Sequence, residues 1–276
     1  MLRYDIENTV AVHVTRACNL ACWLCYQRSV PSGRSHMIPE RVHPAIKWLG
    51  LPNVTIYGGE PLTRPELVRG LLRAFPDKGY ILHTNGTLPL EQNRDILDRV
   101  DVLLLTVESF ELEKQPPSRR LSRVQLGNLL EHIEAYGDKC RIVHNIYPAG
   151  NDESFYDTAE RIGLPVDTYP MVSAGEYSDM PEWLFRKMGT FDAPVSKPKL
   201  RLLEDGTLTR DMRGVYNNPD VPLPCSQKCQ ECLYKRRCPF LMFPHFAHDI
   251  IAEMGSAAPW FCRVTERFTQ ETARNA

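Results

Sequence analysis

The sequence predicts an α/β protein, an open partial (β/α)6 TIM-like barrel followed by a small cysteine-rich unit. Two observations predict this fold. From the N-terminus to about residue 170, short apolar runs alternate with amphipathic stretches, a pattern typical of parallel strands joined by right-handed crossovers. Beyond residue 170 the alternation stops and Pro, Gly, Cys and Arg become frequent. We therefore predict a barrel unit over residues 1–190 and a second unit over residues 191–276.

Each expected strand is a short run rich in β-branched or other apolar residues, and each expected helix is an amphipathic stretch between two such runs. The strands are expected at residues 10–14, 53–57, 80–84, 102–107, 141–146 and 166–169. The helices are expected at residues 39–49, 64–75, 90–99, 122–136 and 152–162. Pro65 marks the start of the second helix. Six strands are fewer than the eight of a closed barrel, so the barrel is expected to be open, with its active site at the C-terminal strand ends.

Composition excludes some classes of partner. The 276 residues include 33 basic and 34 acidic side chains, for a net charge of -1. This balance gives no electrostatic basis for binding nucleic acid or an anionic membrane. The sequence has no apolar run of about 18 residues and no N-terminal secretion signal. We expect a cytoplasmic protein with no nucleic-acid and no membrane partner.

The nine cysteines form two groups and one isolated residue, Cys140, which in a reducing compartment favours metal binding over disulfides. Cys18, Cys22 and Cys25 lie within eight residues, so one short loop can present three thiolates to one face of a four-iron cluster. The fourth iron would then be open to a chelating small molecule. The alternative, a structural zinc knuckle, normally has four ligands with two-residue spacings. Cys140 is expected to be a buried apolar residue.

The cysteine loop carries a family resemblance. Residues 15–26, TRACNLACWLCY, resemble the signature of the radical S-adenosylmethionine (SAM) superfamily, and residues 57–61, YGGEP, resemble its SAM-binding companion. The resemblance covers roughly residues 5–185. It implies that Cys18, Cys22 and Cys25 hold a [4Fe–4S] cluster.

The resemblance also implies where SAM binds. The main chain at Gly58, Gly59 and Glu60, followed by Pro61, would receive the methionine amino group of SAM, because two glycines let a backbone approach a ligand closely. Three further residues are expected to contact SAM: Asn85 at the end of the third strand, Ser109 at the end of the fourth strand and Leu24 in the cysteine loop. Asn85 and Ser109 could equally be turn and cap residues. Leu24 stands where the family usually has an aromatic residue near the adenine, so adenine packing is expected to differ.

The second cysteine group resembles half of the auxiliary-cluster pattern of the SPASM and twitch subfamilies. The ligands implied for a single auxiliary [4Fe–4S] cluster are Cys229, Cys232, Cys238 and Cys262. Asp211 and Met242 stand where the full SPASM pattern would supply cysteines for another cluster. Cys225 is left over, and either replaces Cys262 or ligates in a rearranged pattern. A zinc ribbon is the alternative. A hairpin is expected at residues 200–203 and 207–209.

The resemblance implies reductive cleavage of SAM to a 5′-deoxyadenosyl radical, which abstracts hydrogen from a substrate carbon, with the electron coming from a flavodoxin- or ferredoxin-type donor. An auxiliary cluster can accept an electron from the substrate radical, which favours a net oxidation: dehydrogenation, decarboxylation or bond formation. Few residues precede Cys18, which favours a small-molecule substrate over a peptide. The alternatives are modification of a peptide or protein residue and, in another class, a non-catalytic zinc or electron-transfer protein. The sequence identifies no general base.

Overall fold

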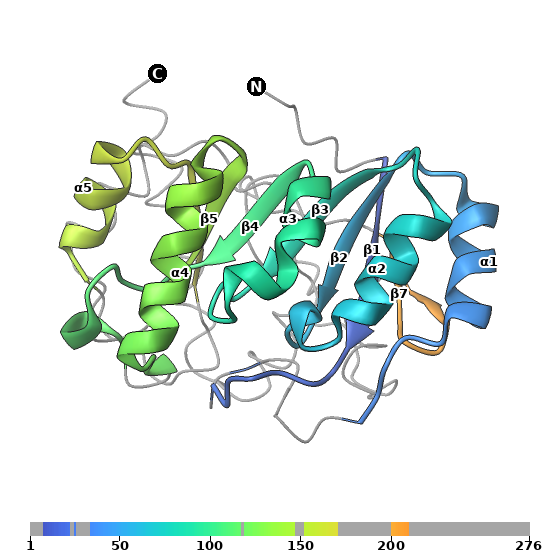
Figure 1. The fold of residues 1–276 in the computed structure, drawn as a ribbon, viewed down its shortest axis with the longest axis horizontal. Coiled ribbons are helices and arrows are strands. Elements are labelled where there is room, and N and C mark those ends of the chain that lie inside the picture. The colour runs from blue at the N-terminus through green and yellow to red at the C-terminus, as the bar shows by residue number, and fades with distance from the viewer. Residues whose placement is uncertain are drawn as a thin grey trace, which may run out of the picture.

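The computed structural model describes residues 8–22, 25, 34–116, 119–146, 152–170 and 200–209. These residues form one sheet covered by helices (Figure 1). The strands are β1 (Thr9–Thr15), β2 (Asn53–Gly58), β3 (Gly79–Thr84), β4 (Val102–Thr106), β5 (Cys140–Ile146), β6 (Val166–Pro170), β7 (Leu200–Leu202) and β8 (Leu208–Thr209). The helices are α1 (Pro39–Leu49), α2 (Pro65–Ala74), α3 (Arg94–Arg99), α4 (Arg123–Tyr136) and α5 (Ser154–Arg161).

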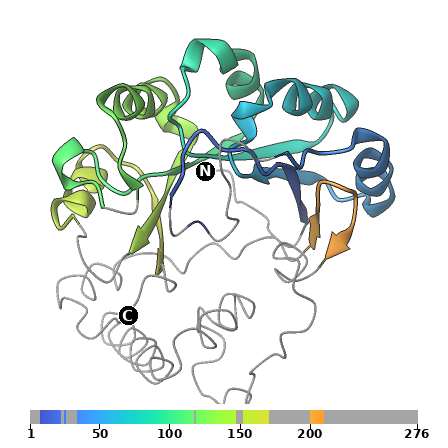
Figure 2. The same ribbon diagram turned by 90° about the horizontal axis from the view of Figure 1, so that it is seen from below.

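The sheet has the order β6-β5-β4-β3-β2-β1-β7-β8. All neighbours from β6 to β7 are parallel, and β8 is antiparallel to β7. Figure 2 shows the sheet as an open arch with the helices along its outer side. The prediction of a parallel α/β fold with an open, partial barrel is confirmed.

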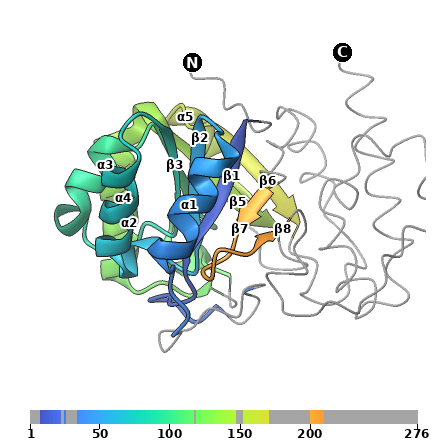
Figure 3. The ribbon, with the colours of Figure 1, turned by 90° about the vertical axis from the view of Figure 1, so that its right-hand side faces the viewer.

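The β7–β8 hairpin has a different place from the one the sequence suggested. It was expected beyond the barrel, yet β7 pairs in parallel with β1 through Val10 and Leu200. Figure 3 shows the hairpin extending the sheet beside β1. The main sheet therefore has a seventh parallel strand that lies beyond the predicted boundary at residue 190.

Strand alternation separates the two faces of the sheet. Val12, Ile56 and Leu103 belong to the apolar core between the strands and the helices. His13 and Tyr57 are also buried but lie outside that core, because neighbouring residues of a strand point to opposite faces. One face of the sheet thus packs against helices, and the other carries polar and aromatic groups.

Local signals set the helix ends close to their expected positions. Ser122 and Gln125 form a reciprocal capping box at the start of α4, and Gly50 ends α1 in the left-handed conformation with φ of 65°. The helix expected at residues 90–99 is divided into a 3-10 turn at Leu90–Asn93 and α3.

None of the helices in the described part of the chain is long and apolar enough to cross a bilayer. Cys140 is 3% exposed, which confirms its prediction as a buried residue.

Candidate active site

The cysteine loop leaves the C-terminal end of β1. Cys18, Cys22 and Cys25 are half-buried, and the backbone N–H of Cys25 donates to the carbonyl of Cys22 at 3.0 Å. Burial, together with the nearby Glu60 and the other two thiols, raises the pKa of Cys18 to about 12. Burial also raises the pKa of Cys22. Thiolates on this loop therefore need a positive partner, and bound iron provides one.

The donor set fits an iron–sulfur cluster. The three thiols lie on one short loop and within electrostatic range of one another. Among the described residues, no three His, Cys, Asp or Glu side chains converge as ligands of a single ion. In a four-iron cluster each thiolate ligates a different iron. Three cysteines can therefore bind such a cluster although their sulfurs do not converge on a single atom.

The Gly58–Gly59–Glu60 segment is fastened to the start of the cysteine loop. The N–H of Gly59 donates to the carbonyl of Thr15 at 2.7 Å, and the N–H of Glu60 donates to the carbonyl of Ala17 at 2.8 Å. Gly58 has φ of 147°, and a β-carbon there would lie 2.5 Å from the carbonyl oxygen of Thr15. The two glycines thus let the ends of β1 and β2 approach closely, and the SAM-binding role stays a prediction.

We expect Gly58→Ala to destabilise the fold by at least about 1–3 kcal/mol, because its φ is unfavourable for a side chain and the clash is with backbone. The variant should also bind less iron after reconstitution, because Thr15 leads into the cysteine loop. Urea denaturation and iron analysis measure both effects. Gly70→Ala in α2 is the matched control, since a β-carbon there meets nothing within 4 Å; it should stabilise the helix by about 0.5–1 kcal/mol. Equal stability of the two variants would contradict the expectation.

The Glu60 side chain joins the segments at the ends of β2 and β3. Its carboxylate is buried and accepts hydrogen bonds from the N–H of Leu62 at 3.0 Å, the hydroxyl of Thr84 at 2.8 Å and the N–H of Asn85 at 2.7 Å. Burial raises its pKa, and these hydrogen bonds oppose the increase. Sequence reasoning assigned a role only to the main chain of Glu60, so this function of the side chain was missed.

Ser109 lies in the turn that follows β4. Its hydroxyl is buried, donates to Asp152 at 2.7 Å and accepts from the N–H of Glu111 at 3.0 Å. These contacts match the turn-residue alternative, and a contact with SAM stays a prediction. Pro61 begins the 3-10 turn Pro61–Thr63.

Several predicted residues lie outside the described ones. They are Leu24, Cys225, Cys229, Cys232, Cys238 and Cys262. The auxiliary cluster and the adenine contact stay predictions.

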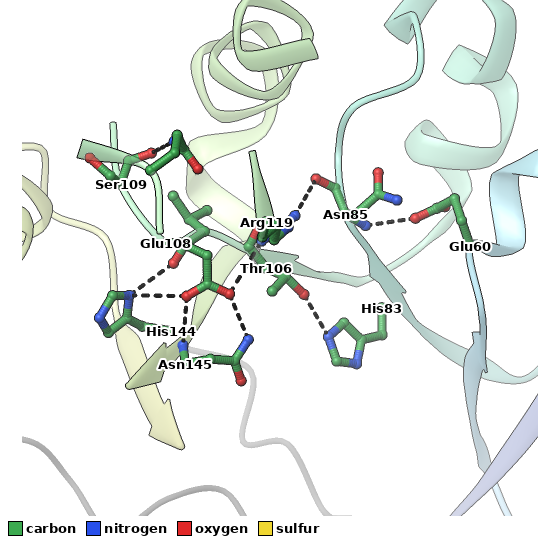
Figure 4. Close-up of polar contacts among 11 residues, drawn as sticks. Glu60, His83, Asn85, Thr106, Glu108, Ser109, Arg119, His144 and Asn145 are labelled. Carbon is green, nitrogen blue, oxygen red and sulfur yellow. Dashed lines mark hydrogen bonds and ion pairs between the residues drawn. The ribbon is translucent and has the colours of Figure 1, made fainter. Parts of the chain in front are cut away.

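A buried ion pair connects the strand ends of the site, as Figure 4 shows. Arg119 is 5% exposed and Glu108 is 3% exposed. The guanidinium donates to the carbonyl of Thr106 at 2.8 Å and to that of Asn85 at 3.4 Å, and lies 3.5 Å from the Glu108 carboxylate. Glu108 also accepts from the side chain of Asn145 at 2.7 Å. Sequence reasoning missed Arg119, which lies in a loop with no motif, and preferred Ser109 to its neighbour Glu108.

Aromatic and polar side chains of adjacent strands form a row of contacts on the face of the sheet that points away from the helices. The His13 ring packs edge-on against Tyr57 with centroids 5.1 Å apart, and Tyr57 lies 5.0 Å from His83. His83 contacts the Thr106 hydroxyl at 3.1 Å. Burial, with Arg201 and Arg16 nearby, lowers the pKa of His13 to about 3. This row of side chains lies on the strands whose ends carry the site.

The chain is similar in sequence to a known family and to curated proteins. The family profile of the radical SAM superfamily matches residues 12–162. A probable GTP 3′,8-cyclase of Methanopyrus kandleri is 35% identical over 118 residues, which are 40% of this chain and 38% of that protein. A GTP 3′,8-cyclase of Aquifex aeolicus is 25% identical over 202 residues, which are 66% of this chain and 61% of that protein. The chain spans less than two thirds of the length of each of these relatives.

Solved structures show the same fold. The structure of native anSMEcpe with bound AdoMet and Cp18Cys peptide has a TM-score of 0.58 at 12% identity, over 94% of this chain and 98% of that one. Streptococcus suis SuiB bound to precursor peptide SuiA has a TM-score of 0.55 at 12% identity, over 78% of this chain and 61% of that one. The matched family profile covers more than half of the chain, from the middle of β1 to α5, including the cysteine loop. The chain belongs to the radical SAM superfamily.

Proposed function

We propose that this protein is a radical SAM enzyme that holds its [4Fe–4S] cluster on Cys18, Cys22 and Cys25. When bound, the cluster and SAM together supply a 5′-deoxyadenosyl radical that abstracts hydrogen from a substrate carbon. The observation that carries the proposal is the pair of hydrogen bonds from Gly59 and Glu60 to the backbone of residues 15 and 17. These hydrogen bonds support the proposal because they hold the cysteine loop next to the predicted SAM-binding segment, at the ends of the neighbouring strands β1 and β2.

The residues around the cysteine loop keep the strand ends in position and take no chemical part in the proposed reaction. Glu60 joins the ends of β2 and β3. Arg119 joins the carbonyls of Asn85 and Thr106 across β3 and β4. Buried, mutually satisfied polar groups of this kind keep a site rigid. Rigid positioning is the protein's part in a reaction whose difficult chemistry belongs to the cofactors.

A small molecule is the substrate class that we propose first. The curated relatives are named GTP 3′,8-cyclases, which supports a small-molecule substrate and bond formation as the kind of reaction. The likeness to peptide-modifying proteins is a likeness of fold at 12% identity, so modification of a peptide is the second proposal. Deuterium transfer from labelled candidate substrates into 5′-deoxyadenosine would distinguish the two.

The proposed redox partners complete this function. We keep the predicted ligand set Cys229, Cys232, Cys238 and Cys262, with Cys225 as a possible replacement for Cys262, for one auxiliary [4Fe–4S] cluster. Such a cluster would accept the electron of a net oxidation. A flavodoxin- or ferredoxin-type donor in the cytoplasm would reduce the SAM cluster.

The decisive experiment is metal analysis and SAM cleavage by the full chain after anaerobic reconstitution. We expect about eight irons per chain, four for each cluster, and formation of 5′-deoxyadenosine from SAM when dithionite is added. Four irons with one zinc would keep the radical chemistry and remove the auxiliary cluster. Zinc at both cysteine groups with no SAM cleavage would overturn the proposal in favour of a non-catalytic metal protein.

A further inference from the structure

The Asn85 side chain contacts the first cysteine of the loop. Its amide nitrogen Nδ2 lies 3.7 Å from Sγ of Cys18 and 2.9 Å from Oδ1 of Asn19. The same sulfur accepts the backbone N–H of Leu20 at 3.4 Å. Two N–H donors, one from the Asn85 side chain at the end of β3 and one from the main chain of Leu20, therefore point at one thiol.

The orientation of the Asn85 amide is fixed by its other contacts. Its Oδ1 accepts the backbone N–H of Thr87 at 2.9 Å, and a backbone N–H can only donate. Oδ1 must therefore face Thr87, which leaves Nδ2 to face Cys18 and Asn19. The usual ambiguity between the oxygen and nitrogen of an asparagine amide is removed by this single bond.

Asn85, Asn19 and Thr87 form a closed ring of hydrogen bonds. Nδ2 of Asn85 donates to Asn19, Nδ2 of Asn19 donates to the Thr87 hydroxyl at 2.8 Å, and that hydroxyl donates to Oδ1 of Asn85 at 2.6 Å. Both hydrogens on Nδ2 of Asn85 and both lone pairs on its Oδ1 are used. The ring joins the cysteine loop to the loop after β3.

The backbone of Asn85 is also held on both sides. Its N–H donates to the Glu60 carboxylate at 2.7 Å, and its carbonyl accepts from Arg119 at 3.4 Å (Figure 4). The position of the amide therefore depends on Glu60, which follows β2, and on Arg119 in the loop before α4, as well as on the ring. A donor held in this way is preorganised toward the sulfur of Cys18.

We propose that Asn85 is a positioning residue that donates a hydrogen bond to the cluster ligand Cys18 and thereby raises the reduction potential of the SAM cluster. This inference rests on the proposed function. An N–H donor draws electron density from the thiolate and stabilises the electron that an external donor adds, in the one-electron reduction from [4Fe–4S]²⁺ to [4Fe–4S]⁺. The predicted contact between Asn85 and SAM is not needed for this role.

Asn85→Ala should lower the midpoint potential of the SAM cluster, measured by EPR-monitored redox titration of the reconstituted full chain. The cluster to follow is the one whose reduced signal changes when SAM is added. We expect reduction to become about tenfold less favourable, equivalent to about 59 mV for a one-electron couple. The matched control is Asn128→Ala, which removes an asparagine donor to the carbonyl of Thr87 at 2.9 Å and should leave the potential unchanged.

A second measurement uses the wild-type protein and does not depend on the variant's folding. Protein labelled with ¹⁵N in its asparagine side chains should show a weak nitrogen coupling to the reduced cluster by pulsed EPR. An unchanged potential in Asn85→Ala with full iron content, or no such coupling in the wild type, would overturn the inference. If no SAM-responsive cluster forms in the wild type, the proposed function fails as well, so the two failures are distinguishable.

Discussion

Simultaneous replacement of Cys18, Cys22 and Cys25 by alanine should remove about four of about eight irons per chain and abolish SAM cleavage. The three thiols share one half-buried loop at the end of β1, and burial raises the pKa values of Cys18 and Cys22. Bound iron offsets the cost of holding these thiolates, and without them no other described cysteine lies on the loop to replace them. Iron analysis and chromatography of 5′-deoxyadenosine measure the two effects.

Cys140→Ala is the matched control for this experiment. Cys140 is a buried thiol at the start of β5 that packs in the apolar core, and burial raises its pKa to about 12. Its replacement should leave both the iron content and SAM cleavage close to wild-type values. Full iron content in the triple variant, or equal iron loss in the Cys140 variant, would contradict the assignment of the cluster to the loop.

Local sequence signals were sufficient for most of the fold. The first helix was predicted at residues 39–49 and lies at Pro39–Leu49, because Pro39 and Gly50 are strong start and stop signals. The β7–β8 hairpin was also found from its turn. Its pairing with β1 was not, because a short strand carries no information about a partner far away in the chain.

The candidate site divides in the same way. The positions of the cysteine loop and the Gly58–Gly59–Glu60 segment follow from motifs that are continuous in sequence. The contacts of Arg119 and of the Asn19–Asn85–Thr87 ring do not, because they join residues from separate loops that only the folded sheet brings together. Glu60 shows both cases, since its motif was recognised while the hydrogen bonds of its carboxylate to Thr84 and Asn85 were not.

Arg119→Met should destabilise the protein by about 3–5 kcal/mol, since the substitution leaves the Glu108 carboxylate buried without its cation. It also removes the donors to the carbonyls of Thr106 and Asn85. The free energy of unfolding, measured by urea denaturation of the apoprotein, reports the effect. Arg94→Met is the control: its pair with Glu91 is exposed, and pairs of that kind contribute little.

A double variant separates the loss of charge pairing from the loss of packing. Adding Glu108→Gln to Arg119→Met removes the unpaired charge while keeping an amide oxygen that can accept from Asn145, so it should recover part of the lost stability. A double variant less stable than Arg119→Met alone would show that the guanidinium acts through its two backbone carbonyls instead. Recovery would establish that the buried ion pair between Glu108, which follows β4, and Arg119, in the loop before α4, stabilises the protein through its balanced charge.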